Sequence, residues 1–158
     1  MRHLIYITLC LFGLATTAQS TILINNVVIF NGKDEKTITG NVLVVNNLIQ
    51  KISTSPIPTN KSGNTVIIDG KGKFLMPGLI DAHWHAILTA STMNELMYAE
   101  PGYVFIKAGD EAANTLMRGF TSVRDLGGPS FGLKKAIDDG VIDGPRIWPS
   151  GSIISQTS

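Results

Sequence analysis

Cysteine is nearly absent from this sequence of 158 residues, and histidine is rare. The single cysteine, Cys10, lies in an N-terminal apolar run, and the three histidines are His3, His83 and His85. Once that run is removed, as argued below, no cysteine remains for a disulfide, a thiolate metal ligand or a nucleophile. Chemistry that needs an imidazole therefore falls to His83 and His85.

Charge is also scarce. The sequence carries 13 Lys and Arg residues against 12 Asp and Glu, and charged residues make up 16% of it. The formal net charge of +1 argues against a basic nucleic-acid-binding surface and against an acidic tail. The 44% hydrophobic fraction is typical of a globular protein. The length suits one ordinary domain and is far short of the roughly 250 residues of a complete eight-stranded β/α barrel.

A secretory signal peptide is predicted at residues 1–18. A basic start, Met1-Arg2-His3, precedes an apolar run from Leu4 to Ala15, and Thr16-Thr17-Ala18 places small residues where a signal peptidase cleaves. A membrane anchor is the alternative, but the run is shorter than the roughly 20 residues that span a bilayer. We therefore expect a periplasmic or secreted protein with no membrane association after cleavage.

Residues 19–73 are predicted to form a small antiparallel β unit without an ionisable cluster. Its β-branched runs are separated by turn residues, and Gly40-Asn41 and Asn46-Asn47 are both predicted as turns. The strands are expected at residues 21–24, 27–30, 37–39, 42–45, 48–52 and 66–68. We interpret this unit as structural.

From residue 74 onwards, strands and helices alternate. Strands are predicted at Leu79–His85, at Thr121–Asp125 and from Arg146, with helices at Tyr103–Arg118 and Phe131–Asp139 between them. This alternation is typical of parallel βαβ units, and the predicted fold class is therefore α/β.

His83 and His85 form a candidate metal site. Residues i and i+2 of a strand point to the same face, about 6.6 Å apart at roughly 3.3 Å per residue, so two imidazoles so placed can converge on one ion. Asp81 is expected on that face too, one step deeper, and Trp84 on the opposite face, where it would pack against helices. The alternative is that the two histidines simply share a polar strand face.

Three motifs resemble the metal-dependent amidohydrolase superfamily, in its imidazolonepropionase-like and Xaa-Pro dipeptidase-like branch. Met76-Pro-Gly-Leu-Ile-Asp-Ala-His-Trp-His85 resembles the first barrel strand, Gly119-Phe-Thr-Ser-Val-Arg-Asp-Leu-Gly-Gly128 the second, and Gly144-Pro-Arg-Ile-Trp-Pro-Ser-Gly-Ser-Ile-Ile-Ser155 the third. The resemblance implies that residues 74–158 are the first two to three units of an incomplete (β/α)8 TIM barrel. It also implies that residues 19–73 are the N-terminal half of a small β-sandwich.

The resemblance further implies roles for individual residues. His83 and His85 would bind one or two zinc ions, or another divalent metal, and a metal-activated water would hydrolyse a C–N bond. Asp81, Arg124 and Asp125 would be candidates to orient the ligands. For Asp81 the alternatives are strand-end hydrogen bonding and metal ligation, and for Arg124 and Asp125 the alternative is an internal ion pair. The family's general base and remaining ligands would lie beyond Ser158, so the chain alone is expected to be inactive.

The implied substrates are small molecules: Xaa-Pro dipeptides, N-acyl amino acids or cyclic amides. No nucleic-acid partner is expected, and a second copy of the chain could cover the open sheet edge in a homo-oligomer. A different class of function stays open at this point. The chain could be a non-catalytic secreted β-rich binding or structural protein, or the relic of a degraded gene, and a non-catalytic metal-binding protein lies between these and the enzyme.

Overall fold

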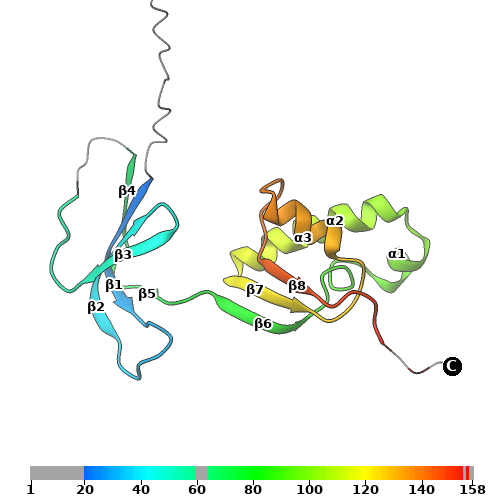
Figure 1. The fold of residues 1–158 in the computed structure, drawn as a ribbon, viewed down its shortest axis with the longest axis horizontal. Helices are drawn as coiled ribbons and strands as arrows, with labels where there is room; N and C mark the ends of the chain where they lie inside the picture. The colour runs from blue at the N-terminus through cyan, green and yellow to red at the C-terminus, as the bar shows by residue number, and fades with distance from the viewer. Residues whose placement is uncertain (1–19, 60–63, 155, 157–158) are drawn as a thin grey trace, which may run out of the picture. The chain divides into compact units, whose positions relative to one another are not determined.

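A computed structural model describes residues 20–59, 64–154 and 156 of the chain. It divides the protein into two compact units, Met1–Met76 and Pro77–Ser158 (Figure 1). The predicted signal peptide, residues 1–18, lies outside the described residues. Among the helices of the described part, none has the length and apolar character needed to cross a membrane.

The first unit is a five-stranded sheet. Its strand order is β3-β2-β1-β4, with β5 also hydrogen-bonded to β1. A small cluster of buried side chains, Val27, Ile29 and Val42, forms its core. The strands are β1 (Thr21–Ile29), β2 (Ile38–Val45), β3 (Leu48–Ser53), β4 (Thr65–Asp69) and β5 (Phe74–Leu75).

Two expectations for this unit were wrong. The sheet is mixed rather than antiparallel, because β1 pairs in parallel with both β4 and β5. No turn forms at Gly40, since β2 runs through it; a Cβ there would lie 2.6 Å from the carbonyl oxygen of Ser53, so the glycine permits close approach of β3. Strand β5 joins this sheet by pairing with β1, and the first unit extends to Met76.

The second unit is of the α/β type, with a parallel three-stranded sheet in the order β6-β7-β8. Helices α2 and α3 pack on one face of this sheet (Figure 1). The strands are β6 (Leu79–Trp84), β7 (Phe120–Asp125) and β8 (Arg146–Pro149), and the helices are α1 (Met93–Tyr98), α2 (Pro101–Met117) and α3 (Phe131–Asp138). The predicted alternation of strand, helix, strand, helix and strand is confirmed.

Local sequence explains where the helices begin. Pro101 stands at the first position of α2, where its missing N–H costs nothing, and the Glu100 side chain accepts a hydrogen bond from the Tyr103 N–H at 3.2 Å. Helix α1 was not predicted. Thr92 and Glu95 form a reciprocal capping box at its start, and this Thr-x-x-Glu pattern is the signal that could have found it.

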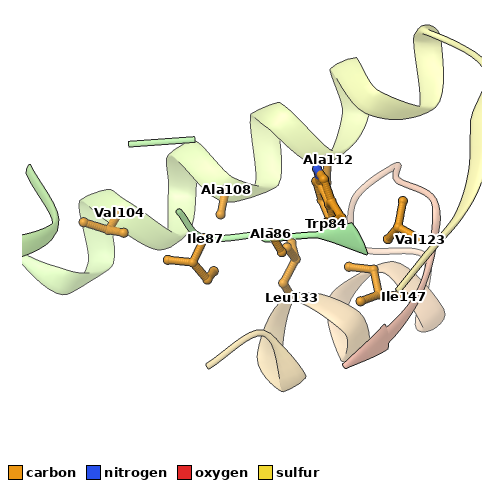
Figure 2. Close-up of a cluster of buried hydrophobic side chains, with 9 residues drawn as sticks. All are labelled: Trp84, Ala86, Ile87, Val104, Ala108, Ala112, Val123, Leu133 and Ile147. Carbon is orange, nitrogen blue, oxygen red and sulfur yellow. The ribbon is translucent and has the colours of Figure 1, made fainter. Parts of the chain in front are cut away.

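A single buried cluster joins the sheet to its helices (Figure 2). Small residues of α2, Ala108 and Ala112, are completely buried and let the helix lie close to the sheet. The predicted packing role of Trp84 against helices is confirmed, since its side chain belongs to this cluster. The members are Trp84, Ala86, Ile87, Val104, Ala108, Ala112, Val123, Leu133 and Ile147.

Candidate metal site

The two histidines lie at the carboxyl end of β6. His83 is within the strand and His85 is the first residue after it, and their ring centroids are 5.3 Å apart with the planes at 70°. Two nitrogens bound to one tetrahedral zinc at about 2.1 Å would lie roughly 3.4 Å from each other. Rings at this separation can meet that requirement through side-chain rotation, so the pair can contribute two ligands to one ion.

The imidazole of His85 has a buried nitrogen without a partner. Its Nδ1 is inaccessible to solvent and makes no hydrogen bond within the described residues, whereas His83 is exposed. A buried polar atom without a partner costs free energy, and such an exception calls for an explanation. An ion bound at the histidine pair would supply one, so the chemistry of this donor set fits a divalent metal.

The main chain around His85 is fixed on both sides. The carbonyl oxygen of His85 accepts hydrogen bonds from the Thr89 N–H at 3.0 Å and the Thr89 Oγ1–H at 2.9 Å. The next amide, the N–H of Ala86, donates to Oδ1 of Asp125 at 3.3 Å. Thr89 carried no sequence signal, because its contact depends on the turn that the chain makes after β6.

Asp81 lies at an irregularity of β6. Its Oδ1 accepts a hydrogen bond from the His83 N–H at 2.9 Å, and the register with β7 shifts between Asp81 and Trp84. Asp81 pairs with Val123, whose side chain is buried against the helices, so the expected simple alternation with His83 is interrupted here. Its observed side-chain contact is this local hydrogen bond within β6.

Arg124 and Asp125 point to opposite faces of β7. Asp125 is completely buried on the helix side, whereas Arg124 is exposed on the other face, where its Nε–H donates to the carbonyl oxygen of Ala82 at 2.8 Å. The alternative of an ion pair between them was wrong, since neither joins an ion pair in the described part of the chain. Neighbouring residues of a strand face away from each other, which separates the two charges.

The described residues offer the two histidines as candidate ligands, without a third beside them. They hold no group of three or more His, Cys, Asp or Glu side chains able to bind a metal ion. A catalytic zinc uses about three protein ligands with a water in the fourth position. The histidine pair can therefore form only part of a catalytic centre.

Comparison with known proteins identifies the second unit. The sequence profile of the Amidohydrolase family matches residues 74–158, which contain both histidines and the whole parallel sheet. The chain belongs to the amidohydrolase family. Members of this family are generally metal-dependent, and the resemblance predicted from the three strand motifs is confirmed.

Two amidohydrolase relatives illustrate the match in sequence. The chain is 36% identical over 87 residues to the ochratoxinase of Aspergillus niger, covering 53% of this chain and 18% of that protein. It is 35% identical over 74 residues to the imidazolonepropionase of Treponema denticola, covering 46% of this chain and 18% of that protein. The chain thus spans only about a fifth of these relatives.

The fold, like the sequence, is similar to part of a larger known protein. A crystal structure of a prolidase complexed with N-methylphosphonate-L-proline is 30% identical, with a TM-score of 0.72 over 84% of this chain and 32% of the other. The strands and helices described above are thus consistent with part of an amidohydrolase barrel, and the predicted α/β fold class is confirmed.

Proposed function

We propose that this chain is the N-terminal part of a zinc-dependent amidohydrolase that hydrolyses C–N bonds in small amides. The first unit would form half of a small β-sandwich, and the second unit the first two to three β/α units of a barrel. Xaa-Pro dipeptides, N-acyl amino acids and cyclic amides are the proposed substrates. The observation that carries the proposal is the histidine pair at the carboxyl end of β6, with the His85 Nδ1 buried and unpartnered.

The position of this pair suits catalysis. Barrel enzymes place their reactive groups at the carboxyl ends of the strands, which is where His83 and His85 lie. These two residues would hold the metal, with Asp81 fixing the His83 amide at the bend of β6. When bound, the ion supplies a water of lowered pKa and polarises the substrate carbonyl. The remaining ligands and the general base would come from later strands.

We also propose export of the protein. The basic start, apolar run and small residues of positions 1–18 support a signal peptide and a periplasmic or secreted enzyme. N-terminal sequencing of the exported protein tests this, with a start near Gln19 expected. A mature protein that begins at Met1 would contradict it.

Zinc titration of the chain by calorimetry tests the metal site. We expect weak binding, because structural zinc sites owe their apparent 10–16 kcal/mol to a closed set of ligands and two ligands cannot complete a tetrahedron. The double variant His83→Ala with His85→Ala should abolish the binding. The titration uses residues 19–158, from which the proposed signal peptide and its His3 are absent, so His83 and His85 are the histidines present in the titrated protein.

Two results would contradict the assignment. Zinc binding that survives the double substitution would place the metal elsewhere. Where the coding sequence continues past Ser158, the longer protein is assayed with zinc on the three substrate classes, and turnover is expected to disappear in His83→Ala. Turnover that persists in that variant would refute a role for His83 in the reaction.

A further inference from the structure

A buried carboxylate connects the ends of two strands beside the histidine pair. Asp125 is completely buried at the end of β7. Its Oδ1 accepts from the Ala86 N–H at 3.3 Å and the Gly127 N–H at 3.4 Å, and its Oδ2 accepts from the Ser130 hydroxyl. No cation pairs with it among the described residues. An unpaired buried carboxylate is costly, so these three donors are what keep it there.

The contact with Ala86 is the one that reaches the metal site. Ala86 follows His85 directly and is itself completely buried, so in the unsubstituted chain Asp125 takes the place of water as the acceptor of its N–H. At the other end of the same peptide, the His85 carbonyl oxygen accepts from both the N–H and the hydroxyl of Thr89. The His85–Ala86 peptide is therefore held at its N–H and at its C=O by two side chains from different elements.

We propose that Asp125 and Thr89 are positioning residues for the metal site. By fixing the His85–Ala86 peptide they set the direction in which the His85 imidazole leaves the main chain, without contacting the metal themselves. This inference rests on the proposed function, in which His85 is a ligand. Metal–ligand distances tolerate only about 0.2 Å of error, so a peptide free to rotate would carry the imidazole out of range.

Ser130 separates this role from a purely structural one. Its hydroxyl donates to the same carboxylate, but from the N-cap position of α3, away from the segment that carries the histidines. Ser130→Ala therefore disturbs the buried polar group while leaving the Ala86 contact in place. In Asp125→Asn, the amide oxygen can still accept from Ala86 and the NH₂ can donate to Ser130, so the peptide stays fixed.

The test compares zinc affinity and urea midpoint in the mature chain, residues 19–158, and in its variants. Asp125→Ala should lower zinc affinity about 10–100-fold, the effect typical of removing a partner that orients a ligand. Asp125→Asn and Ser130→Ala should stay within a few-fold of the unsubstituted chain, even where Ser130→Ala lowers the urea midpoint. Equal losses in Asp125→Ala and Ser130→Ala, or losses that follow only the urea midpoint, would overturn the proposal.

Two further measurements keep the outcome decisive. Hydrogen exchange of the Ala86 amide in the metal-free protein should be slow, fast in Asp125→Ala and slow again in Asp125→Asn; fast exchange in the unsubstituted chain refutes the clamp. If Asp125→Ala does not fold, the Ala86 amide decides the question: slow exchange in both the unsubstituted chain and Asp125→Asn supports the clamp, and fast exchange in either refutes it. Thr89→Val removes only the hydroxyl bond and keeps the Thr89 N–H bond to the same carbonyl, so its loss of zinc affinity should be no larger than that of Asp125→Ala. Zinc binding independent of both histidines would instead refute the proposed function itself.

Discussion

The buried cluster of the second unit makes a quantitative prediction at β8. Ile147 is 1% exposed and lies beside Val123 of β7, whereas Ile154, seven residues later, is 99% exposed. Replacing either by alanine removes the same three carbon atoms. The two substitutions are therefore matched in chemistry and differ almost only in burial.

The expected magnitude follows from that burial. Removing three buried carbons from Ile147 costs about 2.4 kcal/mol of transfer free energy at about 0.8 kcal/mol each. The cavity left behind adds to this, and Ile→Ala changes in cores typically cost about 2–5 kcal/mol. A domain's whole stability is about 5–15 kcal/mol, so Ile147→Ala removes a large share of it. Ile154→Ala should change stability by less than about 0.5 kcal/mol.

Urea unfolding followed by tryptophan fluorescence measures the difference. Both tryptophans, Trp84 and Trp148, lie in the second unit, so the signal reports on this unit alone. With a slope of about 1–3 kcal/mol per molar urea, a cost of about 2–5 kcal/mol for Ile147→Ala lowers the midpoint by roughly 0.7–5 M. Equal midpoints for the two variants would refute the placement of β8 against the helices.

Two further predictions concern the helices. A hydrogen bond from the Thr92 N–H, and next the Lys107 ammonium, lower the pKa of Glu95 from 4.5 to about 2. Because the pKa is lower in the folded state than in the unfolded one, the Glu95 carboxylate stabilises α1 fully above about pH 4.5. This stabilisation is lost as the pH falls through about 2. Amide hydrogen exchange in α1 should accelerate as the pH falls through that window, and in Lys107→Met the acceleration should occur at a higher pH. Identical pH profiles of exchange in the two proteins would contradict the argument. Gly132→Ala in α3 should raise the free energy of unfolding by about 0.4–1 kcal/mol, because the added Cβ meets nothing within 4 Å and the unfolded chain loses conformational entropy. A lowered melting temperature of this variant would count against the prediction.

Local patterns were enough for most elements of the second unit. The apolar spacing of α2 and the Gly and Pro residues that flank β6 and β7 each act within a few residues, and the predicted bounds of these elements agree with the structure to within about two residues. The three strand motifs pointed in addition to the family that the sequence profile confirms. The histidine pair was also visible in sequence, because two residues apart on a strand is a local relation.

The pairing of strands that lie far apart in the sequence was harder to predict. Hydrophobic runs mark the strands of the first unit but do not state which neighbours they choose, so the parallel pairing of β1 with β4 was missed. The register shift in β6 likewise depends on how β7 lies against it, and it altered the expected place of Asp81. Both outcomes belong to contacts between strands and not to either strand alone.

The sequence by itself determined the alternation of elements in the second unit, the family and the two candidate ligands, because each depends on spacing along the chain. Only the tertiary structure decided what surrounds those ligands. Asp125 lies 39 residues from Ala86 in sequence and yet accepts its N–H, and Arg124, its immediate neighbour, points to the opposite face. Hydrogen bonds between distant residues arise when strands pair side by side, and no periodicity within one segment carries that information.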